Sequence, residues 1–170
     1  MSDPDKSDDK TIPAGPLRGL AAAALAIAGT ALALLALVEA WQVFARYVLD
    51  APASWTEPVA LLLLKIALMF AAAVGVRHET HFRFPLGVQA LGPFGRSLLE
   101  GFGRLVTAGI GVVFAGFGAR LMVETWALKT PGAALSVGLY SLPFVAGGAL
   151  FVLFALERML YRDPAVGAPN

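Results

Sequence analysis

Four charged side chains of this 170-residue chain could pair with one another within its first two apolar stretches, where an isolated charge is costly and often marks a functional site. They are Glu39, Arg46, Glu57 and Lys65. If the two stretches that hold them are antiparallel helices joined near residues 51–52, Arg46 lies at the depth of Glu57 and Glu39 at the depth of Lys65. Because each carboxylate then has a basic partner, the arrangement predicts two structural ion pairs. Contact with another subunit and ion transport are the alternative interpretations.

The sequence offers little for catalysis, metal binding or cofactor binding. It contains no cysteine, which excludes disulfides, thiolate metal sites and cysteine nucleophiles. Its two histidines, His78 and His81, lie three residues apart and cannot ligate haem from opposite helices. Since no nucleophile–base pair or ligand cluster stands out, we expect no enzymatic activity, no metal and no cofactor. The net charge of +1 is too balanced to suggest a nucleic-acid partner.

The elements that must position the charges are four apolar stretches that make up most of the chain. About 20 helical residues cross a hydrocarbon core that is ~30 Å thick, and each stretch is long enough. Hydrophobic residues make up 58% of the chain and charged residues 15%, which suits a lipid environment. The sequence therefore predicts an all-α integral membrane bundle. Its four transmembrane helices are expected at residues 17–47, 55–76, 98–123 and 139–161.

The two ends of the chain differ from this membrane domain. Residues 1–16 and 163–170 are polar, contain proline and carry too few apolar residues to fold alone, so we expect disordered tails around a single domain at 17–162. Cleavage of the first stretch as a signal peptide is the alternative. The uncharged run at 20–38 is longer than a signal core, and the segment before it is acidic, so a retained helix is favoured.

The distribution of basic residues predicts the orientation in the membrane. Nine lysines and arginines flank the start of the first stretch, the connection between the second and third, and the end of the fourth. Three lie on the opposite side: Arg46, Arg120 and Lys129. Because cytoplasmic loops carry the excess of positive charge, both termini are expected in the cytoplasm.

Other residues predict helix ends, packing faces and membrane interfaces. Ser54 and Glu57 have the spacing of a capping box at the start of the second helix. The third helix carries small residues at four-residue spacing, which favours close contact with another helix. These residues are Gly111, Ala115 and Ala119. Trp41, Tyr47 and Trp55 suit the membrane interface.

The connection between the second and third helices alternates apolar and polar residues over 82–91. We expect a short segment there that lies on the cytoplasmic interface, with an ordinary loop as the alternative. The prolines and glycines at 85–95, which include Pro93 and Gly95, are expected to interrupt any long helix.

Several motifs together resemble a known family. They are Phe44-Ala-Arg46-Tyr47, then Ser54-Trp55-Thr56-Glu57, then the run 71–81 that contains Arg77 and His81, and finally Tyr140-Ser-Leu-Pro143. In order and spacing they resemble the small membrane (Q-type) subunit of tripartite ATP-independent periplasmic (TRAP) transporters. The sequence departs from that pattern at Pro58, where the family has a second glutamate, and around Lys65, where a tryptophan is frequent.

The resemblance implies an auxiliary role in transport. The partners would be a large membrane subunit, which moves the substrate with a sodium gradient, and a periplasmic binding protein, which delivers it. The substrate would be an organic anion such as a carboxylate or acidic sugar, and the small subunit would not contact it. The location would be the bacterial inner membrane. A self-sufficient small multidrug-type exporter and a membrane anchor of an unrelated complex are the alternatives.

Overall fold

The protein, in a computed structural model that describes residues 16–77 and 93–160, is an all-α membrane bundle, as the sequence predicts. Four of its helices are long and apolar enough to cross a bilayer. They are α1 (Arg18–Tyr47), α2 (Thr56–Arg77), α4 (Pro93–Glu124) and α5 (Leu142–Leu160), and the 3-10 helix η1 (Val137–Ser141) directly precedes α5. The predicted interfacial segment, His78, His81 and the predicted tails except Pro16 lie outside the described residues.

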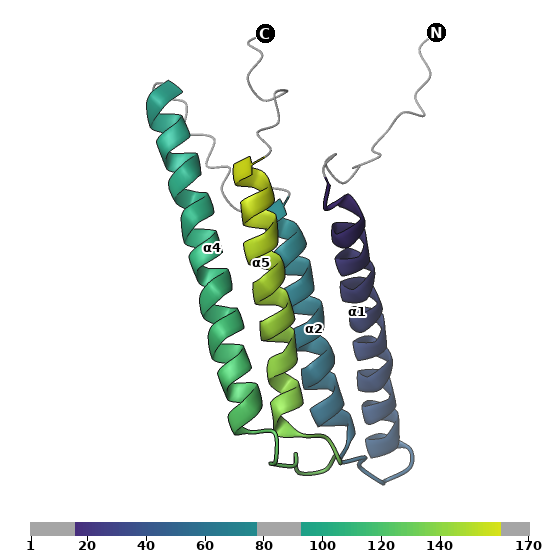
Figure 1. The fold of residues 1–170 in the computed structure, drawn as a ribbon. Coiled ribbons are helices and arrows are strands. Elements are labelled where there is room, and N and C mark those ends of the chain that lie inside the picture. Colours follow the sequence, from purple (N-terminus) through teal and green to yellow (C-terminus); the bar gives the residue numbers. More distant parts are fainter. Residues whose placement is uncertain (1–15, 78–92, 161–170) are drawn as a thin grey trace, which may run out of the picture.

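The four helices stand side by side in the order α1, α2, α5, α4 (Figure 1). Helices α2 and α5 run in the same direction, and α5 lies between α2 and α4 although α4 precedes it in the chain. A pair of glycines in α5 makes this central position possible. A methyl carbon at Gly147 would lie 2.7 Å from Met69 Cβ on α2, and one at Gly148 would lie 2.6 Å from the Gly111 carbonyl oxygen on α4. Both neighbours therefore approach the α5 backbone closely.

The helix ends differ from the sequence prediction at two places. Helix α2 begins at Thr56, so Ser54 lies one residue before the N-cap position, and the Thr56 hydroxyl instead donates a hydrogen bond to the Ala53 carbonyl at 2.7 Å. Helix α4 begins at Pro93 and continues through Gly95, so the expectation that Gly95 interrupts a helix was wrong, while the residues expected to do so at 85–92 lie outside the described residues. Proline is well tolerated in the first helical position because the N–H that it lacks has no partner there.

The start of the last span has a specific cause. The Leu142 N–H bonds to the Leu139 carbonyl in the i to i+3 pattern of η1. The next residue that could bond to this carbonyl in an α-helix is Pro143, which has no N–H. The chain therefore makes a 3-10 turn before α5 begins.

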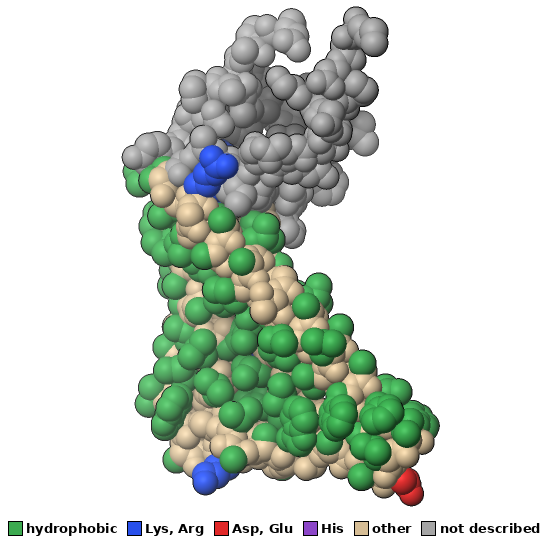
Figure 2. Space-filling model, turned by 90° about the vertical axis from the view of Figure 1, so that its right-hand side faces the viewer, with side chains coloured by type: hydrophobic (Ala, Val, Ile, Leu, Met, Phe, Trp, Pro, Cys, Tyr) green, Lys and Arg blue, Asp and Glu red, His purple; other side chains and the backbone are tan. Residues whose placement is uncertain are grey.

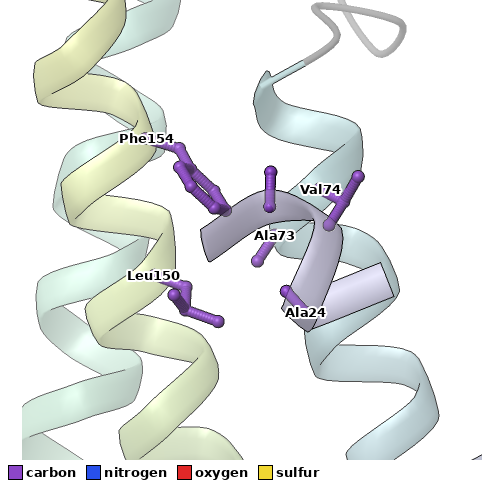
Figure 3. Packing of buried hydrophobic residues seen from close by; sticks show 6 residues of the cluster. Ala24, Ala73, Val74, Leu150 and Phe154 are labelled. Carbon is purple, nitrogen blue, oxygen red and sulfur yellow. The ribbon is translucent and has the colours of Figure 1, made fainter. Parts of the chain in front are cut away.

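The core lies where α1, α2 and α5 meet (Figure 3). Ala21 and Ala24 of α1 face Ala73 of α2 and Leu150 and Phe154 of α5, and all five are buried. Small side chains on α1 let its backbone approach the other two helices, as expected for packing in lipid.

The large apolar side chains mostly point away from this core. Leucines, valines and phenylalanines are exposed along α1 and along α4 from Phe102 onward. In the coloured part of Figure 2, most side chains are hydrophobic, and basic or acidic side chains are seen only near its two ends. This distribution is that of a protein whose outer surface meets lipid or another membrane protein.

Candidate functional site

A buried ion pair connects the ends of α2 and α5. Arg77, the last residue of α2, donates from Nε to Glu157 Oε2 at 2.8 Å and from a terminal guanidinium nitrogen to Oε1 at 3.2 Å. The side chains are only 2% and 5% exposed. This two-bond geometry is the one that guanidinium and carboxylate groups favour, and it fixes both the distance and the relative rotation of the two helices.

Two further hydrogen bonds bring the start of α1 to the same place. The Leu17 N–H, directly before α1, donates to Glu157 Oε1 at 3.0 Å. Arg158 Nε donates to the Arg77 carbonyl at 2.8 Å. The first N–H and the last carbonyl groups of a helix have no partner within it, so both bonds satisfy groups that would otherwise be unpaired. We call Leu17, Arg77, Glu157 and Arg158 the three-helix junction.

The sequence produces this junction because α2 and α5 are parallel and end at the same level. A basic residue at the C-terminus of α2 is also favoured by the helix dipole. The Phe154 ring, one turn before Glu157, is completely buried and lies 6.0 Å from the Arg77 guanidinium carbon. One guanidinium nitrogen, Nη1, is buried without a hydrogen-bond partner.

The ion pair of the junction is suited to a structural role. Both Glu157 oxygens already accept hydrogen bonds, and the carboxylate is enclosed, so it is poorly suited to bind and release an ion. Within residues 16–77 and 93–160, no three histidine or acidic side chains come together in a way that could hold a metal ion.

The contact between α4 and α5 is built on glycine. A methyl carbon at Gly111 would lie 2.8 Å from the Gly148 carbonyl oxygen, and one at Gly148 would lie 2.6 Å from the Ala115 nitrogen. One at Gly118 would lie 3.1 Å from Phe144 Cβ. Ala115 and Ala119 are partly buried. The α4 face that carries Gly111 and Gly118 is thus the face that contacts α5.

The four charged residues that the sequence singles out lie outside this junction. Glu39, Arg46 and Glu57 are exposed, and Lys65 is half-buried. In the part of the chain that the structure describes, no ion pair joins Arg46 to Glu57 or Glu39 to Lys65. The Lys65 ammonium instead lies 5.1 Å from the centre of the Tyr140 ring. The two predicted ion pairs therefore rest on the sequence alone and stay predictions.

Comparison with known families decides the identity of this bundle. The family described as "Tripartite ATP-independent periplasmic transporters, DctQ component" matches residues 35–164 of the 170. The chain belongs to the DctQ family. No curated protein matches the chain significantly.

Membership of the DctQ family confirms the resemblance to small TRAP transporter subunits. The matched region contains α2, α4, α5 and the last part of α1, and so includes Arg77, Glu157 and Lys65. Members of the DctQ family are components of a transporter and not enzymes. Together with the four candidate spans, it identifies a multi-pass membrane protein.

Glu157 is the residue that the sequence reasoning for this DctQ chain missed. Depth matching relates residues on antiparallel neighbours such as the first and second helices, whereas Glu157 belongs to a parallel neighbour, 80 residues from Arg77. A signal was present in the sequence. Glu157 is the one acidic residue between 125 and 162, and it stands near the end of its span, as Arg77 does.

The aromatic residues singled out from the sequence lie mainly on the surface. Trp41, Tyr47 and Trp55 are all exposed, and the Trp41 ring centre lies 5.8 Å from that of Phe44. Exposure is compatible with a position at the membrane interface. That position stays a prediction for the DctQ chain.

The predicted pair Arg46–Glu57 can be tested by a double-mutant cycle. We expect Arg46→Met and Glu57→Gln each to destabilise the chain, and the double variant to cost less than their sum by about 0.5 kcal/mol or more, because one change already removes the interaction. The measurement is the free energy of unfolding in detergent for the four proteins. Additive effects would show that the two residues are not coupled.

Proposed function

We propose that this chain is the small membrane subunit of a sodium-coupled secondary transporter that imports organic anions, carboxylates or acidic sugars. A periplasmic binding protein would deliver the substrate. The observation that carries the proposal is the match of the DctQ family over residues 35–164. The geometry supports an auxiliary role, because the buried charges of the three-helix junction are engaged with one another.

The proposed partner in the membrane is a larger subunit that moves the substrate, and this chain would stabilise it. Two features support that role. The buried residues of α1 are all alanines, whereas its large side chains, such as Leu37 and Val43, are exposed. A helix with its bulky residues outward offers a broad apolar surface to a membrane partner. Direct contact with the substrate is not part of the proposal.

The proposed location is the bacterial inner membrane with both termini in the cytoplasm. The start of α1 and the end of α5 lie at the same end of the bundle (Figure 1), where Glu157 accepts the Leu17 N–H. Arg18, Arg77 and Arg158 cluster at that end, and cytoplasmic ends carry the excess of basic residues. The three-helix junction would then mark the cytoplasmic side.

Co-purification tests the proposal. The tagged chain, produced together with the large membrane subunit of the same system, is expected to retain that subunit in equal amounts through detergent extraction and gel filtration. An unrelated four-helix membrane protein with the same tag is the control. Recovery of the chain without the large subunit, under conditions in which both are stable, would contradict the proposed role.

A further inference from the structure

Lys65 is a cation that the three-helix junction does not use. It lies on α2, half-buried, and its side chain contacts α5 and η1. The ammonium nitrogen lies 5.1 Å from the centre of the Tyr140 ring and 5.8 Å from that of the Phe144 ring. The two rings attract the ammonium by cation–π contacts. They supply no negative charge.

The depth of Lys65 makes the lack of a negative charge costly. The residue stands nine positions after the start of α2 and twelve before its end, so its α-carbon is about 13 Å from one end of the helix and 18 Å from the other. Both distances place it within a span that fits a hydrocarbon core ~30 Å thick. A charge at that depth is usually paired with another group.

Two donors at this place have no acceptor. Among the side chains that the structure describes in 16–77 and 101–160, no carboxylate lies within ion-pair distance of the Lys65 ammonium. The ring of Tyr140 contacts the ammonium, and the Tyr140 hydroxyl is buried and has no hydrogen-bond partner. An ammonium and a hydroxyl on adjoining side chains both need an oxygen acceptor. We call Lys65, Tyr140 and Phe144 the Lys65 site.

We propose that the Lys65 site binds a carboxylate presented by a transmembrane helix of the larger membrane subunit. This inference rests on the proposed function and adds the chemistry of one contact to it. A carboxylate carries two oxygens that can accept from both donors, and its charge complements that of Lys65. The contact would fix the depth and rotation at which the partner helix meets α2 and α5.

Depth favours a helix carboxylate over the other sources of negative charge. A phospholipid phosphate lies outside the hydrocarbon core, and the four-carbon stem of a lysine covers only part of the ~13 Å to the nearer end of α2. Glu39, the partner that the sequence predicts for Lys65, is on α1, whereas the Lys65 side chain is directed to Tyr140 of η1 and Phe144 of α5. A carboxylate from the partner is therefore the alternative to that predicted pair. A carboxylate on a partner helix can stand at the required level.

The experiment measures how much of the large subunit stays bound to the tagged chain during a detergent wash. Lys65→Met keeps the stem and removes the charge, and it is expected to lower retention at least tenfold, since one charge of a buried pair is then left alone. Lys65→Arg should retain the partner. Arg120→Met, which removes an exposed cation from α4, is the matched control and should bind as the wild type does. Gel filtration of each variant alone checks that it folds.

Charge reversal identifies the acceptor. Lys65→Glu should abolish retention, and changing one membrane-embedded Asp or Glu of the large subunit to Lys should restore it. Normal retention by Lys65→Met, or loss that no reversal restores, would overturn the inference. So would loss of a bound phospholipid from Lys65→Met in native mass spectrometry with the complex intact, or the same loss of binding in Glu39→Gln. If the wild-type chain itself retains no large subunit, the proposed function fails instead.

Discussion

Replacing Arg77 by methionine is expected to lower the free energy of unfolding of the chain by about 3–5 kcal/mol. The change leaves the Glu157 carboxylate enclosed with its main partner removed, and it also breaks the link between the ends of α2 and α5. Because Glu157 also receives the Leu17 N–H, the start of α1 should loosen too. Unfolding in detergent, followed by the helical signal, measures the loss.

The chain provides a matched control for this experiment. Arg120 and Glu124 form an ion pair at 2.7 Å, but their side chains are 74% and 54% exposed. Arg120→Met should change stability by less than about 1 kcal/mol. The double variant Arg77→Met, Glu157→Met should be more stable than Arg77→Met alone, because no buried charge is left unpaired. An Arg77→Met protein as stable as Arg120→Met would show that the junction does not hold the helices together.

The second large effect is expected at Gly148, where α4 and α5 are in closest contact. Gly148→Ala would place a methyl carbon 2.6 Å from two backbone atoms of α4, and the backbone must move to relieve this contact. We expect a loss of about 1–3 kcal/mol, and a larger loss for Gly148→Leu.

Gly116→Ala is the control for Gly148→Ala, because a methyl group at Gly116 meets no atom within 4 Å. Alanine is the better helix former by about 1 kcal/mol, so this variant should be at least as stable as the wild type. Thermal unfolding of both variants in the same detergent makes the comparison. Equal stability of the two would mean that α4 and α5 are not in close contact in the protein.

The spans could be predicted from the sequence because the thickness of the bilayer sets the length of the apolar run that a helix needs to cross it. The predicted ends of the first two helices agree with the structure to within one residue. The apolar run at 98–123 indicates the membrane span of α4, but α4 itself begins five residues earlier, at Pro93, because a proline is tolerated in the first turn. The 3-10 turn of η1 depends on a single missing N–H at Pro143, which hydropathy does not report.

The junction was harder to predict than the spans. Arg77 was singled out from the sequence as a family-motif residue, but its partner lies 80 residues away on a helix whose position beside α2 does not follow from chain order. The spacing of small residues indicates that Gly111 is a packing residue, but it does not indicate that Gly148 of α5 lies opposite it. Pairing between distant helices depends on how they are arranged in space, and local patterns do not determine that arrangement.

The central claim, that this chain serves a transporter without transporting by itself, is tested most directly by reconstitution. The measurement is uptake of a labelled organic anion, one that the periplasmic binding protein of the same system binds, into proteoliposomes under a sodium gradient. Vesicles that contain this chain, the large subunit and the added binding protein are expected to accumulate the anion. Vesicles with this chain alone should show none, and omission of the chain from the complete system should abolish or sharply reduce uptake. Uptake by the chain alone, or undiminished uptake in its absence, would contradict the account.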